Sequence, residues 1–268
     1  SDAELADPRY VRSYGWLSGT LQFDAEHFGL SATEAALIDP QHRLFVECAA
    51  EALATAGSEI AALGARTGVF AGCLPSAYLL QIVHHAAAAS LPELNLELGN
   101  HQDFLASRVA WHLGLNGPAV NINAACATSL FAIHAACSAL QRGECDLALA
   151  GAASVRRFFP TGYRAEPGGV LSADGRCRPF DIAGTGTVFG DGVGCLVLRR
   201  AEEARRDGQP IYGVIAASAI GNDGANRPSF AAPAADGQRR VMENAYALLS
   251  TNAAARVAFV EAHGTGTL

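Results

Sequence analysis

The chain contains no lysine, because all 19 of its basic residues are arginine. Within these 268 residues this absence excludes a P-loop, a Schiff-base lysine and a serine–lysine dyad, since each of them depends on a lysine amine. Charged residues make up only 17% of the chain, and the net charge is −7. We therefore expect no nucleic-acid partner, because binding one requires an excess or a stripe of basic side chains.

The sequence also lacks the patterns of membrane and secreted proteins. Its apolar stretches are broken before the ~20 residues needed to span a bilayer, and its first residues are acidic rather than apolar, which argues against a signal peptide. The seven cysteines are an odd number and contain no C-x-x-C pair, which argues against a disulfide framework and a zinc ribbon. We expect a soluble cytoplasmic protein that makes no membrane contact.

The remaining composition predicts one α/β domain over residues 1–268. Hydrophobic residues make up 50% of the chain, enough for a sizeable core without disulfides or metals. Strand-like and helical patterns alternate, which favours helices packed around a largely internal sheet. We expect strands over residues 66–72, 119–124, 146–153, 193–198, 211–220 and 257–261, and helices over 40–56, 101–113, 128–141, 201–207 and 238–249.

Local signals indicate where some of these elements begin and end. Asp39 followed by Pro40 predicts a helix start, and Gly57 predicts the end of the same helix. The helix over 128–141 is apolar nearly all round, so we expect it to be buried between layers. Residues 155–192 are rich in Gly and Pro and predict a long irregular loop of the kind that often lines a site.

Cys126 is the candidate nucleophile. It lies between a strand that ends at Ala124 and a helix that begins near Thr128, so its sulfur should sit at a helix N-terminus. Unpaired N–H groups and the helix dipole favour the thiolate there, and small neighbours leave room for a substrate. For the other cysteines we expect the usual buried and inert thiol: Cys48, Cys73, Cys137, Cys145, Cys177 and Cys195.

His263 is the second candidate catalytic residue. It follows the predicted strand over 257–261 and opens the sequence His-Gly-Thr-Gly-Thr, whose glycines let backbone and hydroxyl groups approach a ligand closely. α/β proteins commonly place functional groups at the carboxyl ends of strands. The remaining histidines lack the spacing of metal ligands, and we expect no metal site.

With Cys126 in Asn-Ala-Ala-Cys-Ala-Thr-Ser-Leu and His263 in Val-Glu-Ala-His-Gly-Thr-Gly-Thr, the chain resembles the β-ketoacyl synthases, and in particular the ketosynthase domains of modular polyketide synthases. The resemblance covers nearly the whole chain, and it extends through residues 39–47, 115–120, 143–151, 171–181 and 188–194. It implies a thiolase-like fold with αβαβα layers, of which this chain would hold the N-terminal half and the start of the C-terminal half.

The resemblance also implies a reaction. Cys126 would take an acyl group from the phosphopantetheine thioester of an acyl carrier protein, and decarboxylating malonyl-carrier protein would then attack that group to give a β-ketoacyl thioester. His263 would stabilise the enolate, and Thr265 and Thr267 would contact the pantetheine arm. The implied partners are the carrier protein, other polyketide synthase domains and a second copy of the chain, and no bound cofactor is implied.

Part of the family pattern is absent from the chain. The family completes its catalytic set with a lysine and a second histidine beyond the position of Leu268, and it begins with an apolar strand before the position of Ser1. We therefore expect a partial ketosynthase domain that looks truncated at both ends. Two alternatives to chain elongation stay open, a non-catalytic fragment or scaffold and a ketosynthase that only transfers acyl chains.

Overall fold

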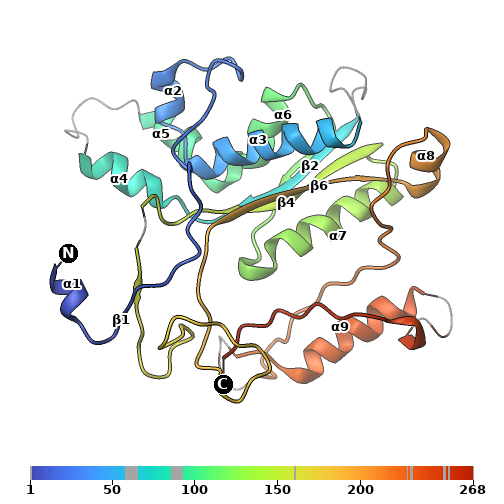
Figure 1. The fold of residues 1–268 in the computed structure, drawn as a ribbon. Helices are drawn as coiled ribbons and strands as arrows, with labels where there is room; N and C mark the ends of the chain where they lie inside the picture. Colours follow the sequence, from blue (N-terminus) through green and yellow to red (C-terminus); the bar gives the residue numbers. More distant parts are fainter. Residues whose placement is uncertain are drawn as a thin grey trace.

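A four-stranded mixed sheet lies at the centre of the computed structural model, in the strand order β3-β2-β4-β6 (Figure 1). β2 (Thr67–Cys73) runs parallel to β3 (Ala119–Asn121) and to β4 (Leu147–Ser154), whereas β6 (Gly192–Arg199) runs antiparallel to β4. The structure thus confirms an α/β arrangement. It describes residues 2–57, 66–85, 93–159, 161–227, 229, 232–249, 252 and 254–267.

Helices cover both faces of this sheet. α3 (Pro40–Thr55) and α6 (Leu105–His112) pack on one face, and α7 (Thr128–Gln141) packs on the other (Figure 1). Because side chains alternate along a strand, the core is divided in the same way. In β2, Val69 belongs to the apolar cluster on the α3 and α6 side, whereas Phe70 belongs to the cluster on the α7 side. The sheet is therefore the middle of three layers.

α3 begins and ends where the sequence predicts. The Asp39 carboxylate accepts a hydrogen bond from the Gln41 N–H at 2.8 Å, and Pro40 occupies the first helical position. Gly57 follows the helix with a φ of +72°, a conformation that glycine adopts without the steric cost of a Cβ. Burial of one large side chain of this helix, such as Phe45, stabilises the fold by roughly 1.5–3 kcal/mol.

Shorter elements surround this core. A two-stranded antiparallel sheet pairs β1 (Tyr10–Val11) with β5 (Tyr163–Arg164). The other helices and single helical turns are α1 (Asp2–Ala6), α2 (Ala32–Ala36), α4 (Ala77–His85), α5 (Glu93–Asn100), η2 (Gln102–Phe104), η3 (Ala125–Ala127), α8 (Ala201–Arg206), α9 (Ala235–Ala247) and η4 (Ala254–Arg256). Among the helices of the described ranges, none has the length and apolar character needed to cross a membrane.

The segment between β4 and β6 is the long irregular loop predicted over residues 155–192. Apart from β5, the β-pairing of its described residues is confined to isolated bridges, such as the one between Leu171 and Thr187. Asp191 anchors the end that enters β6, because its carboxylate accepts a hydrogen bond from the Tyr14 hydroxyl at 2.8 Å.

The two strands predicted over 211–220 and 257–261 are not formed. Neither segment pairs with a strand among the described residues. An alternating apolar pattern indicates which side chains share a face, but a strand also needs hydrogen bonds to a neighbouring strand. Large apolar side chains in these segments stay exposed as a result, among them Tyr212, Val214 and Phe259.

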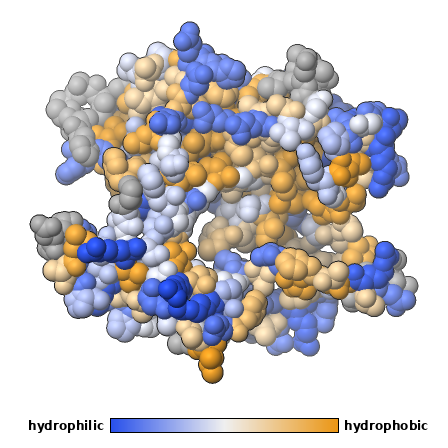
Figure 2. Space-filling model, viewed as in Figure 1, coloured by the Kyte–Doolittle hydropathy of each residue, from blue (hydrophilic) through white to orange (hydrophobic). Residues whose placement is uncertain are grey.

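The helix predicted over 128–141 is confirmed as α7, but it is not buried on all sides. Ala132 and Ala136 are fully buried against the sheet, whereas Leu130 is 67% exposed. On the side of α7 away from the sheet lie α9 and the chain that leads to and from it (Figure 1). His134 reaches that chain, since its Nδ1 lies 2.9 Å from the Ser218 Oγ. Figure 2 shows the surface hollowed between the sheet layer and this lower part.

Candidate active site

Cys126 lies in the middle of a tight turn of residues 124–128, which we call the elbow. The elbow leads from β3 through η3 into α7, so the predicted position of Cys126 at a helix N-terminus is confirmed. The Cys126 thiol is exposed. The first turn of a helix has N–H groups without intrahelical acceptors, and the helix dipole is positive there. The elbow therefore presents a sulfur to solvent at a place where negative charge is stabilised.

The backbone of the elbow is strained at Ala125. Its φ is +50°, in the left-handed region that costs a residue with a Cβ about 1–2 kcal/mol. The Thr128 Oγ1 spans this residue, because it accepts a hydrogen bond from the Ala124 N–H at 2.9 Å and donates one to the Ala125 carbonyl at 2.8 Å. The strained turn is thus held by a side chain from the start of α7.

β2 passes close to the elbow and to Ile122, the residue that follows β3. A Cβ on Gly72 would overlap the Ile122 carbonyl oxygen and would lie 2.6 Å from the Thr128 Cγ2. The two segments can therefore touch only because residue 72 is glycine. Asn121 ties the same region to α6, since its Oδ1 accepts a hydrogen bond from the Ala106 N–H at 2.9 Å.

Sequence reasoning missed these supports of the elbow. Gly72 and Asn121 carried no local signal of their own, because their partners are distant in the sequence. Thr128 was expected only at a helix start, and its polar side chain at that position was the one available signal. The reactive residue could thus be found from its neighbours in sequence, but its supports could not.

His263 begins the second part of the candidate site, residues 263–267, which we call the threonine loop. The His263 side chain is exposed. The hydroxyl oxygens of Thr265 and Thr267 lie 2.9 Å apart and share a hydrogen bond. The two glycines of the loop have φ angles of +55° and +64°, which glycine adopts readily. The loop therefore displays two ordered hydroxyl groups and an imidazole on a tightly turned backbone.

Residues 172–190 of the irregular loop pack against the threonine loop, and we call them the cradle loop. The Gly186 N–H donates a hydrogen bond to the Gly266 carbonyl at 2.9 Å. The Cys177 thiol donates to the Gly264 carbonyl at 3.4 Å. Two donors from the cradle loop thus hold the backbone on which His263 is carried.

An ionic contact orders the cradle loop around Cys177. The Asp174 carboxylate accepts hydrogen bonds from the Arg178 guanidinium and from the Ser172 hydroxyl, both at 2.8 Å. The hydrogen bond from Arg178, followed by that from Ser172, lowers the pKa of Asp174 from 3.8 to about 2. Asp174 is therefore ionised at neutral pH and closes the turn that carries Cys177.

The structure does not bring Cys126 and His263 into direct contact. In the part of the chain that the structure describes, neither side chain has a hydrogen-bond partner. The elbow comes from the edge of the central sheet, and the threonine loop comes from the segment on the other side of α7 (Figure 1). Both groups are open to solvent and so are accessible to a substrate.

Burial separates Cys126 from most of the other thiols. Cys73 and Cys145 are buried as predicted, and burial raises the pKa of Cys73 and of Cys195 to about 12. The prediction of a buried thiol is wrong for Cys177, which is exposed. The large apolar side chains nearest to it in the loop, Phe180 and Ile182, are themselves exposed and do not cover it.

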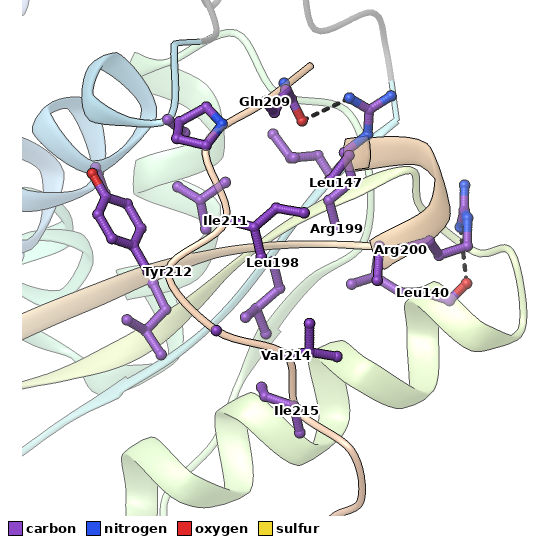
Figure 3. Close-up of a pocket in the computed structure, with 18 of the residues that line it drawn as sticks. Leu140, Leu147, Leu198, Arg199, Arg200, Gln209, Ile211, Tyr212, Val214 and Ile215 are labelled. Atoms are coloured by element: carbon purple, nitrogen blue, oxygen red, sulfur yellow. Dashed lines mark hydrogen bonds between the residues drawn. The ribbon is translucent and has the colours of Figure 1, made fainter. Parts of the chain in front are cut away.

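A cavity of about 1090 Å³ lies elsewhere, between β6, the ends of α3 and α7, and residues 209–215 (Figure 3). Its wall is mostly apolar, and its arginines are already paired: Arg199 donates to the Gln209 Oε1 at 2.7 Å, and Arg200 donates to the Leu140 carbonyl at 2.8 Å. None of the candidate catalytic side chains lines it. The cavity is therefore separate from the candidate active site.

Two family models match the sequence. The model described as Beta-ketoacyl synthase, N-terminal domain, matches residues 1–204, and the model described as Beta-ketoacyl synthase, C-terminal domain, matches residues 212–268. The first match contains the elbow, and the second contains the threonine loop.

Large polyketide synthases are among the similar proteins. The chain is 41% identical over 268 residues to mycoketide-CoA synthase of Mycobacterium tuberculosis, an alignment that covers 99% of the chain and 6% of that protein. It is 42% identical over 275 residues to a phenolphthiocerol/phthiocerol polyketide synthase of the same organism, with 100% of the chain and 18% of that protein covered. The chain thus spans a small part of these relatives.

Solved ketosynthases have the same fold. Ketosynthase twelve of the bacillaene polyketide synthase of Bacillus amyloliquefaciens superposes with a TM-score of 0.89 at 27% identity, covering 100% of this chain and 47% of that one. The module 6 ketosynthase of the Bacillus subtilis bacillaene synthase gives a TM-score of 0.85 at 32% identity, covering 100% of this chain and 45% of that one. The chain spans about half the length of these structures.

Proposed function

This chain belongs to the β-ketoacyl synthase family of acyltransferases, and from that premise we propose that it is part of a ketosynthase that extends acyl chains in a polyketide synthase. It has the layered, thiolase-like α/β fold of its ketosynthase relatives. Residues 1–268 would form one portion of a ketosynthase domain, since the chain covers 47% of a solved ketosynthase.

In the proposed reaction, the Cys126 thiolate attacks the carbonyl carbon of an acyl thioester on the phosphopantetheine arm of an acyl carrier protein. A bond from the acyl carbon to the Cys126 sulfur forms, the pantetheine carbon–sulfur bond breaks, and the pantetheine thiol leaves with a proton. A malonyl group on a carrier protein then loses CO2, and its carbanion attacks the acyl group on Cys126. The Cys126 thiolate is released, and the product is a β-ketoacyl thioester.

The observation that carries the proposal is the exposure of Cys126 on the elbow at the N-terminus of α7. The positive end of the helix dipole faces this position and would stabilise the negative charge that develops on a bound acyl group during attack. The N–H of Cys126 itself lies in η3, directly before the N-cap of α7, and would donate to the oxyanion of a tetrahedral intermediate. Nucleophile and oxyanion donor would then come from the same residue.

The threonine loop has the second role in the proposal. His263 would donate a hydrogen bond to the enolate oxygen that develops as CO2 leaves, and Thr265 and Thr267 would contact the pantetheine arm. The exposure of His263 and the hydrogen bond between the two hydroxyls support these roles. The proposed chemistry needs the carrier protein as a partner and uses no metal or bound cofactor.

The proposed assembly is a homodimer, and the open edge of the sheet supports it. β3 is the end strand of the sheet, so among the described strands it pairs only with β2. The outer edge of such a strand offers backbone N–H and C=O groups to another chain. Apolar surface adjoins this edge, since Val120 is 40% exposed and Trp111 is 74% exposed. Sedimentation should give a dimer for the wild type and a monomer for Val120→Arg, and a monomeric wild type would contradict the proposal.

The proposed location is the cytoplasm, where the other domains of a polyketide synthase and the carrier protein would also act. All seven cysteines are free thiols in the structure, which supports a reducing compartment.

Acylation of the wild-type chain by a small acyl thioester tests the proposed function. Intact mass spectrometry should show the addition of one acyl group, and peptide mapping should place it on Cys126. Cys126→Ala should abolish this addition. Cys177→Ala is the matched control, because Cys177 is also exposed, and it should leave the addition unchanged. Acylation of Cys177 as fast as that of Cys126 would overturn the assignment.

Addition of malonyl-carrier protein separates chain extension from the two alternatives. A β-ketoacyl product supports elongation, whereas stable acyl-Cys126 without a condensed product supports a ketosynthase that only transfers acyl chains. A chain that cannot be acylated at Cys126 is a non-catalytic scaffold.

A further inference from the structure

We propose that the Thr128 hydroxyl positions Cys126 for attack by holding Ala125 in its left-handed conformation. The inference rests on the proposed function of Cys126 and deepens it, because it assigns a positioning residue to that nucleophile. Thr128 itself touches neither the sulfur nor a substrate, and it acts through the backbone of the elbow.

Two hydrogen bonds enclose the strained residue. The Thr128 Oγ1 accepts from the Ala124 N–H at 2.9 Å and donates to the Ala125 carbonyl at 2.8 Å. A single oxygen atom thus binds one peptide group before Ala125 and one after it. The backbone between these two groups includes the φ of +50° at Ala125, so a change in this torsion alone would move the two groups relative to each other and strain both bonds.

The oxygen that holds the elbow is itself held in place. Thr128 is the first residue of α7 and is only 9% exposed. Its Cγ2 packs over Gly72 in β2, where the absence of a side chain makes room for it. The methyl group of Thr128 thus points toward β2, and the hydroxyl points toward the elbow, where its own two hydrogen bonds orient it. α7 and β2 both pack in the core. Because Thr128 is fixed by these two elements, its hydroxyl holds the turn in a fixed position relative to them.

The consequence for Cys126 follows from the geometry of the chain. Cys126 comes directly after Ala125, so a change in the Ala125 torsions swings the Cys126 sulfur away from the first turn of α7. Attack on a bound carbonyl depends steeply on such placement, and a shift of about 1 Å can reduce a rate roughly a hundredfold. If Ala125 relaxed to a negative φ, the Cys126 sulfur would therefore stay exposed but would no longer lie in the position needed for attack.

Two substitutions separate the hydroxyl from the methyl group. Thr128→Val keeps the shape and the contact with Gly72 but removes both hydrogen bonds. Thr128→Ser keeps the hydroxyl and removes the methyl. Leu140→Ala is a matched control for lost stability, because Leu140 is buried at the opposite end of α7, away from the elbow.

The experiment measures two rates at Cys126 in each variant, alkylation by iodoacetamide and acylation by a small acyl thioester. Alkylation of Cys177 in the same sample serves as an internal standard. We expect Thr128→Val to slow both Cys126 rates by about tenfold or more, mainly through the maximal acylation rate rather than the KM, with Cys177 unchanged. Thr128→Ser and Leu140→Ala should stay within about threefold of the wild type even where they lower the melting temperature.

Each outcome decides the proposal. Wild-type Cys126 rates in folded Thr128→Val would overturn it, as would a loss of Cys126 reactivity in Leu140→Ala that matches its loss of stability. If Thr128→Val does not fold, Thr128→Ser decides, because a tenfold loss with the hydroxyl retained would overturn the proposal. If the wild type is alkylated at Cys126 but never acylated, the proposed function fails, and the alkylation ratios still test Thr128.

Discussion

The Cys177 thiol donates a hydrogen bond to the Gly264 carbonyl at 3.4 Å and so joins the cradle loop to the threonine loop. Gly264 follows His263 directly, so the backbone that carries the imidazole is held by a residue from a distant part of the sequence. Cys177 is also exposed. The two exposed thiols of the chain therefore lie in the two separate parts of the candidate site, Cys126 on the elbow and Cys177 against the threonine loop.

Replacing Cys177 by Ala should loosen the threonine loop. A neutral hydrogen bond contributes roughly 0.5–1.5 kcal/mol, so we expect the Gly186 amide, which donates to the Gly266 carbonyl of this loop, to exchange hydrogen about twofold to tenfold faster. Cys177→Ser keeps a donor and should restore part of the protection, while acylation of Cys126 should stay the same in both variants. Equal exchange rates in the three proteins would show that this contact does not hold the loop.

Asp174→Asn should open the cradle loop, because it removes the charge that Arg178 and Ser172 bind. Trypsin reports this directly, since a chain without lysine is cleaved only after arginine, and we expect faster cleavage after Arg176. Glu166→Gln, which also removes a surface carboxylate that pairs with an arginine, is the matched control and should leave that cleavage unchanged.

The pH dependence of Asp174 has a definite sign. Its pKa is lowered to about 2 by Arg178 first and Ser172 second, so the contact is fully present above 3.8 and is lost as the pH falls through about 2. An NMR titration of the Asp174 carboxyl should therefore show a midpoint well below 3.8. A midpoint near 3.8 would mean that Arg178 does not pair with it.

His42 should make the stability of the fold depend on pH. It is fully buried between the Arg108 guanidinium, whose Nε lies 3.3 Å from its Nδ1, and the Cys73 thiol, 3.8 Å from its Nε2. Burial, and then the charge of Arg108, lowers the pKa of His42 from 6.5 to about 3. At a pH between about 3 and 6.5, His42 is therefore protonated in the unfolded chain and neutral in the folded chain.

Stability from neutral His42 is therefore fully present above pH 6.5 and is lost as the pH falls toward 3. We expect the free energy of unfolding to fall by about 1.4 kcal/mol for each pH unit in this window. Urea unfolding at pH 8, 6 and 5 should show this slope for the wild type and a smaller slope for His42→Gln. Parallel slopes would indicate that His42 is protonated in the folded state.

Local sequence signals predicted much of the sheet layer. The start of α3 at Pro40 and the bounds of α7 follow from caps, glycines and helical periodicity, all of which act within a few residues. Strand β4 was found within one residue of its bounds, because its apolar run is short and is enclosed by turns. These elements need no knowledge of distant partners.

The rest depended on partners that are distant in sequence. Residues 211–220 and 257–261 have strand-like patterns, but pairing decides whether such a pattern becomes a strand. The exposure of Cys177 likewise follows from what the cradle loop packs against. Cys126 could be selected from its neighbours alone, whereas Gly72 became part of the site only through its approach to Ile122.

Gly72→Ala should disturb the fold and the elbow together. The new methyl group would overlap the Ile122 carbonyl oxygen and would press on the Thr128 Cγ2 at 2.6 Å, and neither β3 nor the start of α7 can move without losing its packing on β2. Overpacking of this kind lowers the free energy of unfolding by about 1–3 kcal/mol.

Gly192→Ala provides the matched control for this substitution. A Cβ at Gly192 meets no atom within 4 Å, so the change should alter stability by less than about 1 kcal/mol and leave Cys126 unaffected. Urea unfolding and the rate of Cys126 acylation measure the two effects side by side. We expect Gly72→Ala to lose both stability and Cys126 reactivity, because displacement of Thr128 releases the strained backbone of the elbow. If Gly72→Ala behaves like Gly192→Ala in both measurements, β2 and the elbow are not in the close contact that holds Cys126 in place.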